Sequence, residues 1–268
     1  ARRKIASIRR PVRLGHRVFL TGRLDPAMID ACVVALKEFK QTLATHELAR
    51  FRAVVTASAR DAVNSHELLA RVEKEAGIPL EAISGSEEAR LVKLAVDSQM
   101  ELGGYRSLLV DLGGGSLELS EVNHDEVRFS TSLEIGTVRL LESFLSPDGQ
   151  VTDYQDKLIT DYLDRKLAPS EDTFRRRRYD IVAGTGGNFD TVARLCPVPG
   201  REMATIHVPS ARALLARMKQ LTPVERQAAY DLRADRADVI VPALYVIVRC
   251  ADLARTEEIV TPGVGLKD

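Results

Sequence analysis

The sequence predicts an α/β protein of two domains, and three observations support this prediction. The chain has 268 residues, 45% of them hydrophobic, which is enough to build more than one buried core. Short buried-strand patterns alternate with helical patterns, the order typical of α/β proteins. A loop at Gly103-Gly104 separates two such halves, and the second half opens with a new strand. We therefore expect domains at residues 1–103 and 104–268.

The first half contains two predicted strand–helix units after an initial helix. Asp25 is placed to cap that helix and Pro26 to occupy its first position. A strand at 51–56 leads to a helix that Asn64 opens, with Glu67 three residues later as a capping box. A second strand at 80–83 turns into a helix that carries Leu91, Val92, Leu94 and Ala95.

The second half repeats this alternation. Strands at 107–111 and 117–120 form a hairpin around glycines, and a third strand follows at 127–130. Glycines at 184–187 join another strand to a helix, and Thr222 with Glu225 forms a second capping box. The remaining predicted elements are helices at 137–146, 152–167 and 236–254 and strands at 180–183 and 258–261.

The composition argues against several classes of protein. Lys plus Arg and Asp plus Glu number 38 each, so no overall basic field attracts nucleic acid or an anionic membrane. The four arginines at 175–178 are more typical of a solvated helix end than of a site that attracts polyanions. Three separated cysteines indicate neither disulfides nor zinc, which favours a cytoplasmic protein. The apolar stretch 239–248 is shorter than the roughly 20 residues of a membrane span.

The first chemistry-bearing motif is the hairpin Asp111-Leu-Gly-Gly-Gly-Ser-Leu-Glu118. Glycines can expose successive backbone N–H groups to phosphoryl oxygens, and the two acids supply the oxygen ligands that Mg²⁺ prefers. The alternative is a tight hairpin with two surface acids, which is about equally expected for this segment alone.

The second motif, Gly184-Thr-Gly-Gly-Asn188, lies between a strand and a helix. Its amides therefore stand at a helix N-terminus, where anions are favoured. A glycine turn for close packing is slightly the better explanation of this motif alone, but two such turns in one half favour phosphate binding.

The third motif contains the adjacent acids Glu87 and Glu88. Glu88 precedes Leu91, Val92 and Ala95 by helical spacing, so its carboxylate can face inward and act as a general base. The spacing alone favours a simple helix-terminus role for both acids. Arg60 follows a strand directly, where α/β proteins bind ligands, although a surface arginine without a role is commoner.

Together these motifs resemble the exopolyphosphatase and guanosine pentaphosphate phosphohydrolase family. The resemblance covers almost the whole chain and rests on ordered segments: Arg13-Leu-Gly15, Thr21 to Leu24, Thr56 to Asn64, Ile83 to Leu91, Asp111 to Leu119, Gly136 to Leu140, Gly184 to Leu195, Arg236 to Ile240 and Gly265-Leu266. It implies two ribonuclease H-like (actin-like ATPase) domains with the active site in the interdomain cleft. The first strands of domain one, with the family's first phosphate loop, are expected before the start of this sequence.

The resemblance also implies an activity and roles for particular residues. Water would attack the terminal phosphoanhydride of inorganic polyphosphate, with Glu88 as general base and Mg²⁺ or Mn²⁺ held by Asp111 and Glu118. The phosphate-binding residues would be Arg60, Gly113, Gly114, Gly115, Ser116, Gly186 and Gly187. A homodimer without nucleic-acid or membrane partners is expected.

Other functions remain open on the sequence. Hydrolysis of guanosine pentaphosphate would use the same residues. A non-catalytic phosphate or nucleotide sensor is favoured by the absent first loop and by Leu117, which stands where the family has threonine. A sugar or acetate kinase is disfavoured by Glu87-Glu-Ala-Arg90, which is typical of the hydrolases.

Overall fold

The structure is a computed structural model that describes residues 8–10, 12, 14–15, 17–46, 51–146, 149–175 and 177–267. Arg13 of the first family segment and one arginine of the run 175–178, Arg176, lie outside the described residues. The chain divides into two compact units, Ala1–Ile83 and Ser84–Asp268. The domain boundary predicted at 103/104 falls later than this division, because the helix after residue 84 packs on the sheet of the second unit.

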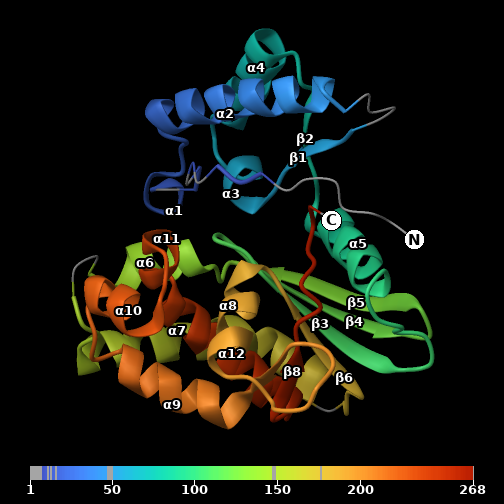
Figure 1. The fold of residues 1–268 in the computed structure, drawn as a ribbon, viewed down its shortest axis with the longest axis vertical. Helices are drawn as coiled ribbons and strands as arrows, with labels where there is room; N and C mark the ends of the chain where they lie inside the picture. The colour runs from blue at the N-terminus through green and yellow to red at the C-terminus, as the bar shows by residue number, and fades with distance from the viewer. Residues whose placement is uncertain are drawn as a thin grey trace. The chain divides into compact units, whose positions relative to one another are not determined.

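The first unit packs its helices around a two-stranded parallel sheet (Figure 1). The predicted first helix is present, and the Asp25 side chain accepts a hydrogen bond from the Ala27 N–H. Its apolar face, with Ile29 and Val33, packs with the second long helix in one core. The elements are α1 (Val18–Thr21), α2 (Pro26–Ala44), β1 (Ala53–Val55), α3 (Ala57–Arg60), α4 (Ser65–Ala76) and β2 (Leu80–Ala82).

The second unit contains a six-stranded mixed sheet with the strand order β5-β4-β3-β6-β8-β7. Its strands are β3 (Arg106–Leu112), β4 (Leu117–Asn123), β5 (Glu126–Leu133), β6 (Ile181–Thr185), β7 (Thr205–His207) and β8 (Glu258–Val260). β3, β4 and β5 form an antiparallel meander, and β6 and then β8 continue the sheet parallel to β3. This is the ribonuclease H-like arrangement of the actin-like fold, which the family resemblance implies.

Alternation along β3 sends side chains to two cores on opposite faces of the sheet. Leu108, Val110 and Leu112 belong to the larger core, with α12 at its centre. Leu109 belongs to a smaller core beneath α5 (Figure 1). The helices of this unit are α5 (Gly85–Asp97), α6 (Thr137–Phe144), α7 (Asp153–Arg175), α8 (Gly187–Leu195), α9 (Val208–Met218), α10 (Pro223–Tyr230), α11 (Ala234–Ala237) and α12 (Ile240–Ala254).

Three predictions of local structure are wrong. The Asn64 side chain does not cap α4, because it is bonded to the backbone of Leu24. Its Oδ1 accepts from the Leu24 N–H, and its Nδ2 donates to the Leu24 carbonyl. The helix predicted to end at 167 continues as α7 to Arg175, because buried Ser170 and Phe174 anchor its last turns. The helix predicted over 236–254 is interrupted after α11, since Pro242 suits the first turn of a new helix, α12.

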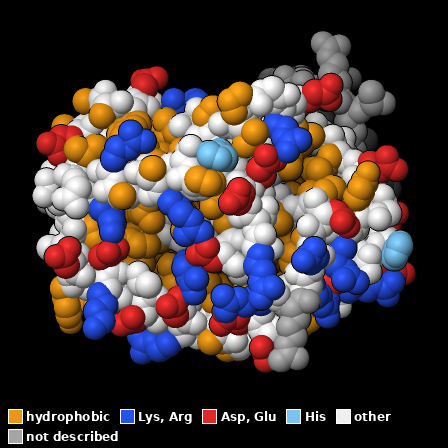
Figure 2. Space-filling view, turned by 90° about the horizontal axis from the view of Figure 1, so that it is seen from below, with side chains coloured by type: hydrophobic (Ala, Val, Ile, Leu, Met, Phe, Trp, Pro, Cys, Tyr) orange, Lys and Arg blue, Asp and Glu red, His pale blue; other side chains and the backbone are white. Residues whose placement is uncertain are grey.

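The charged run is also more structured than predicted. α7 ends at Arg175, and Arg177 forms an ion pair with the buried carboxylate of Glu121. On the face in Figure 2, Lys and Arg side chains are interspersed with Asp and Glu, in keeping with equal numbers of the two signs. In the described part of the chain, no helix is both long and apolar enough to cross a membrane.

Candidate active site

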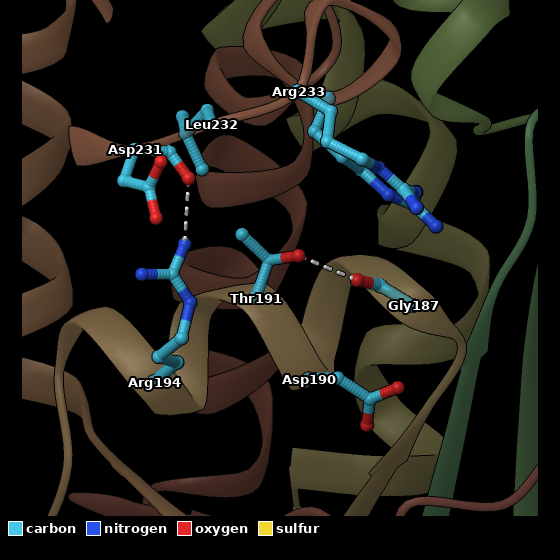
Figure 3. A pocket seen from close by; sticks show the side chains of 8 residues that line it. Gly187, Asp190, Thr191, Arg194, Asp231, Leu232 and Arg233 are labelled. Atoms are coloured by element: carbon cyan, nitrogen blue, oxygen red, sulfur yellow. Dashed lines mark hydrogen bonds between the residues drawn. The ribbon is translucent and has the colours of Figure 1, made fainter. Parts of the chain in front are cut away.

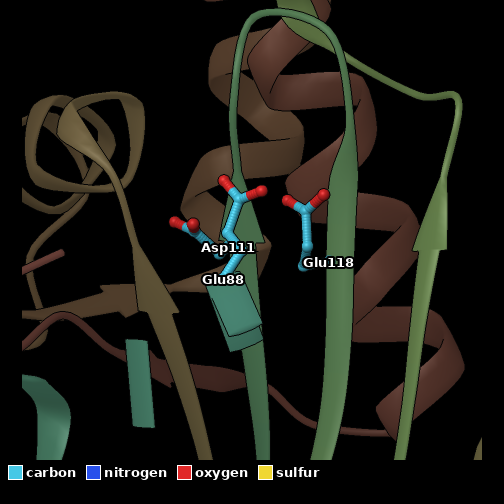
Figure 4. A group of neighbouring side chains, drawn as sticks. All are labelled: Glu88, Asp111 and Glu118. Atoms are coloured by element: carbon cyan, nitrogen blue, oxygen red, sulfur yellow. The ribbon is translucent and has the colours of Figure 1, made fainter. Parts of the chain in front are cut away.

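Three carboxylates of the second unit converge at one point (Figure 4). Asp111 and Glu118 are register partners on β3 and β4, so the sheet sets their side chains next to each other on one face. Glu88 reaches the same point from α5. One ligand oxygen from each of the three lies within 4.8 Å of the others. Three oxygen donors at this spacing can hold a divalent cation.

The orientation of Glu88 follows from the pattern of α5. Ser84 caps the helix by accepting the Glu87 N–H, and Glu88 falls on the stripe that also buries Val92 and Ala95. Glu88 is accordingly 5% exposed, which confirms the inward direction that the spacing predicts. Its neighbour Glu87 instead pairs through both carboxylate oxygens with Arg90.

Electrostatics favour a cation at this cluster. Like charges directly opposite each other on paired strands are destabilising, and Asp111 and Glu118 are such a pair. Burial raises the pKa of Asp111, although a hydrogen bond from Thr185 and the charge of Lys267 partly oppose this rise. A hard divalent cation would relieve the repulsion and matches an all-oxygen donor set. The residues present therefore fit Mg²⁺ or Mn²⁺.

The first glycine turn, residues 113–115, lies at the end of the hairpin that carries the two acids. The Gly113 N–H donates to the Ser116 carbonyl, and Gly114 accepts from the first turn of α6. The Arg139 side chain donates to the Gly115 carbonyl at 3.1 Å. Among the described residues, no acceptor engages the N–H groups of Gly114 and Gly115. These two amides are available to an anion.

Gly136 holds this turn in place by close approach. A Cβ at Gly136 would lie 2.2 Å from the Gly114 carbonyl oxygen and 2.4 Å from the Gly115 carbonyl carbon. We expect Gly136→Ala to cost about 1–3 kcal/mol of stability and to displace the turn, because backbone cannot yield as a flexible side chain can. Denaturant unfolding checks the first effect and phosphate affinity the second. Gly149→Ala is the control, because a Cβ there would meet only the Ser146 Cβ, at 3.4 Å, and equal losses in both variants would contradict the close-approach argument.

The second glycine turn meets the first acid of the cluster. Gly186 has φ 97°, a conformation that glycine adopts readily. A Cβ there would lie 3.0 Å from the Leu112 carbonyl oxygen and 3.6 Å from Oδ1 of Asp111. The structure thus brings Gly186, which precedes α8, beside the strand that leads into the first turn. The two glycine motifs predicted from the sequence lie together.

A cavity of about 260 Å³ opens at the N-terminus of α8 (Figure 3). Gly187 and Thr191 form its helical wall, and three arginines and two aspartates also line it: Arg194, Arg233, Arg236, Asp190 and Asp231. A Cβ at Gly187 would lie 2.3 Å from Nη2 of Arg236, so this glycine gives the guanidinium access to the helix end.

Arg60 belongs to the first unit. Its guanidinium donates to the Asp61 carboxylate at 2.8 Å and to the Ile83 carbonyl at 3.0 Å. The side chain is 24% exposed, so part of it is accessible. Within its unit it ties the end of α3 to the residue that follows β2, and phosphate binding by Arg60 stays a prediction.

The sheet and the acidic cluster together define a class: an α/β protein of the actin-like fold with three carboxylates that could hold a cation, beside two glycine turns. The model of the Ppx/GppA phosphatase family matches residues 3–268. The chain belongs to that family.

Curated relatives agree with this membership. Exopolyphosphatase 1 of Mycobacterium tuberculosis is 32% identical over 248 residues, which cover 90% of this chain and 72% of the relative. Exopolyphosphatase 2 of the same organism is 33% identical, with 86% of this chain and 75% of the relative covered.

Solved structures match the fold over nearly the whole chain. A structure of an exopolyphosphatase from Cytophaga hutchinsonii superposes with a TM-score of 0.86 at 28% identity and covers 96% of this chain and 84% of that one. A Ppx/GppA family member from Aquifex aeolicus superposes with a TM-score of 0.77 at 27% identity, with the same coverage.

Sequence reasoning missed several residues that contact the site. Arg139 and Gly136 lie in a segment quoted for the resemblance, but no role was predicted for them. Thr185 and Ser132 donate hydrogen bonds to the cluster and were not predicted at all. Their pairing depends on strand register, which the sequence pattern leaves open.

Proposed function

We propose that this protein is a metal-dependent exopolyphosphatase, which hydrolyses the terminal phosphoanhydride bond of inorganic polyphosphate. One observation carries the proposal: Glu88, Asp111 and Glu118 place one ligand oxygen each within 4.8 Å of the others. The relatives named exopolyphosphatase support the substrate class. Cleavage of a phosphoanhydride requires a positioned water, a proton acceptor and compensation of negative charge, and this cluster with its glycine turns has groups for each.

In this proposal the three carboxylates divide into two roles. Asp111 and Glu118, fixed opposite each other on the sheet, would hold Mg²⁺ or Mn²⁺, which when bound supplies positive charge to the phosphoryl oxygens. Glu88 approaches from a different element and is the general base that takes a proton from the attacking water. Its burial suits this role, because it keeps the proton transfer away from bulk water.

The terminal phosphate would be bound by backbone amides. The N–H groups of Gly114 and Gly115 are oriented by the hydrogen bonds that fix their turn. Gly186 and Gly187 place a second set at the N-terminus of α8, where the helix dipole favours an anion. Arg236 and the other arginines of the adjacent cavity add positive charge for the rest of the substrate. Gly113, Ser116 and Arg60 are proposed as further phosphate contacts.

Guanosine pentaphosphate is the second candidate substrate, because its terminal phosphoanhydride needs the same chemistry and the cavity beside Gly187 offers polar groups next to a phosphate site. Parallel assays of orthophosphate release from both substrates decide between them, and we expect the larger kcat/KM with polyphosphate. Binding of either substrate without release in Mg²⁺ or Mn²⁺ would instead identify a sensor. The homodimer and the cytoplasmic location implied by the resemblance stay predictions, and sedimentation tests the first.

A further inference from the structure

The candidate cation site lies within a row of four polar side chains that crosses the sheet. Asp111 on β3 is the register partner of Glu118 on β4 and of Thr185 on β6. Glu118 is in turn the register partner of Ser132 on β5. The row therefore runs hydroxyl, carboxylate, carboxylate, hydroxyl over four neighbouring strands. Register partners point to the same face, so each hydroxyl can reach the acid beside it.

Each hydroxyl donates to one carboxylate. Thr185 Oγ1 donates to Oδ1 of Asp111 at 2.6 Å, and Ser132 Oγ donates to Oε1 of Glu118 at 2.9 Å. Among the described residues, Thr185 is the side chain that the structure shows donating to Asp111. A hydroxyl bond to one oxygen restricts the rotation of the carboxylate.

The two donors differ in their surroundings, since Thr185 is buried and Ser132 is exposed. Thr185 is 1% exposed, and its branched side chain has restricted rotation in a strand. Ser132 lies against the first turn of α5, where a Cβ at Gly85 would be 3.1 Å from its own Cβ. That contact also links Ser132 to the helix that carries Glu88. Packing thus sets the Thr185 hydroxyl before any cation arrives, while the Ser132 hydroxyl is directed by its hydrogen bond to Glu118.

We propose that Thr185 and Ser132 are positioning residues, which orient Asp111 and Glu118 for the divalent cation. This inference rests on the proposed function, since it takes these two acids as the metal ligands. Partners of this outer-shell kind typically change metal affinity by about 10- to 100-fold when removed. Neither hydroxyl need touch substrate or metal, so the effect should appear in metal binding without substrate.

The test is calorimetric titration of Mn²⁺ alone into the metal-free chain. We expect Thr185→Val and Ser132→Ala each to raise the Kd by about 10- to 100-fold, because the carboxylates lose their fixed orientation. Thr185→Ser keeps the hydroxyl and loses only a methyl group, so its Kd should stay within about threefold of the wild type. Thermal melts establish that each variant folds.

Two controls remove hydroxyls of the same unit that do not donate to the carboxylates, one on partly buried Ser130 and one on buried Thr205. Ser130 lies two residues before Ser132 on β5 and accepts from Ser120, and Thr205 on β7 donates to the Met203 carbonyl. Ser130→Ala and Thr205→Val should leave the Mn²⁺ affinity unchanged.

Wild-type affinity in both Thr185→Val and Ser132→Ala would overturn the inference, as would equal losses in Thr185→Ser and Thr185→Val. If Thr185→Val lacks a cooperative melt, the Ser132→Ala titration decides in the same way. A wild type that binds Mn²⁺ but releases no phosphate contradicts the proposed function and leaves the positioning roles standing. A wild type that binds no Mn²⁺ overturns both.

Discussion

Glu88→Gln is expected to lower the turnover of polyphosphate by about 10²- to 10⁴-fold, because it removes the proton acceptor and keeps the size of the side chain. The substitution replaces a carboxylate that is 5% exposed and lies in the acidic cluster. Since Asp111 and Glu118 remain, the variant should still bind Mn²⁺, and its KM should change much less than its kcat.

Glu87→Gln is the matched control for this effect. Glu87 is adjacent to Glu88 on the same helix turn but forms an ion pair with Arg90, so its substitution should cost little activity. The measurement is steady-state phosphate release by both variants, with thermal melts to establish folding. Near-parental turnover by Glu88→Gln, or a larger loss in Glu87→Gln, would remove Glu88 from the role of base.

Asp111→Asn should lower Mn²⁺ affinity by more than about 100-fold, which exceeds the usual effect of outer-shell partners because a charged ligand is lost. The same substitution should stabilise the metal-free protein at neutral pH. Burial raises the pKa of Asp111 above its usual 3.8, so the folded chain binds this proton more tightly than the unfolded chain. The metal-free wild type therefore loses stability as the pH rises from 3.8 through the raised pKa of Asp111.

Both effects, the lost Mn²⁺ affinity and the gain in metal-free stability, are checked by melting temperatures. These are measured for the wild type and Asp111→Asn, each with and without Mn²⁺. The advantage of the metal-free variant should be larger at about pH 7.5 than at about pH 4.5, and Mn²⁺ should stabilise the wild type far more. Asp125→Asn is a suitable control, because it removes a carboxylate from the exposed β4–β5 turn. A variant that Mn²⁺ stabilises as strongly as the wild type would show that Asp111 is not a ligand.

The order of strands, glycine turns and helices in the second unit follows from local sequence. β3, β4, β6 and β8 all lie where short apolar runs and turn residues predict them. Errors arise where a distant contact outweighs a local preference. Asn64 has the residue type and spacing of a helix cap, but its amide bonds to Leu24, forty residues earlier in the chain. Single-chain pattern reading cannot detect such a partner.

The site could be predicted in part for the same reason. Asp111 and Glu118 are linked by a short hairpin, and Glu88 is turned inward by the spacing of its own helix. Thr185 reaches Asp111 only through the parallel pairing of β3 with β6, across a separation of 74 residues. Ser132 meets Glu118 through the β4–β5 register, which shifts between Glu121 and Val122. A shift of one residue would turn Ser132 to the other face.

The dependence of polyphosphate hydrolysis on the cation tests the central claim most directly. Orthophosphate release is measured over a range of Mn²⁺ concentrations, in the buffer used for calorimetric titration of the metal alone. We expect no turnover in excess chelator, and a half-maximal rate near the Mn²⁺ concentration that half-fills a site lost in Asp111→Asn. Full turnover in excess chelator, or saturation unaffected by Asp111→Asn, would contradict an active site built on Glu88, Asp111 and Glu118.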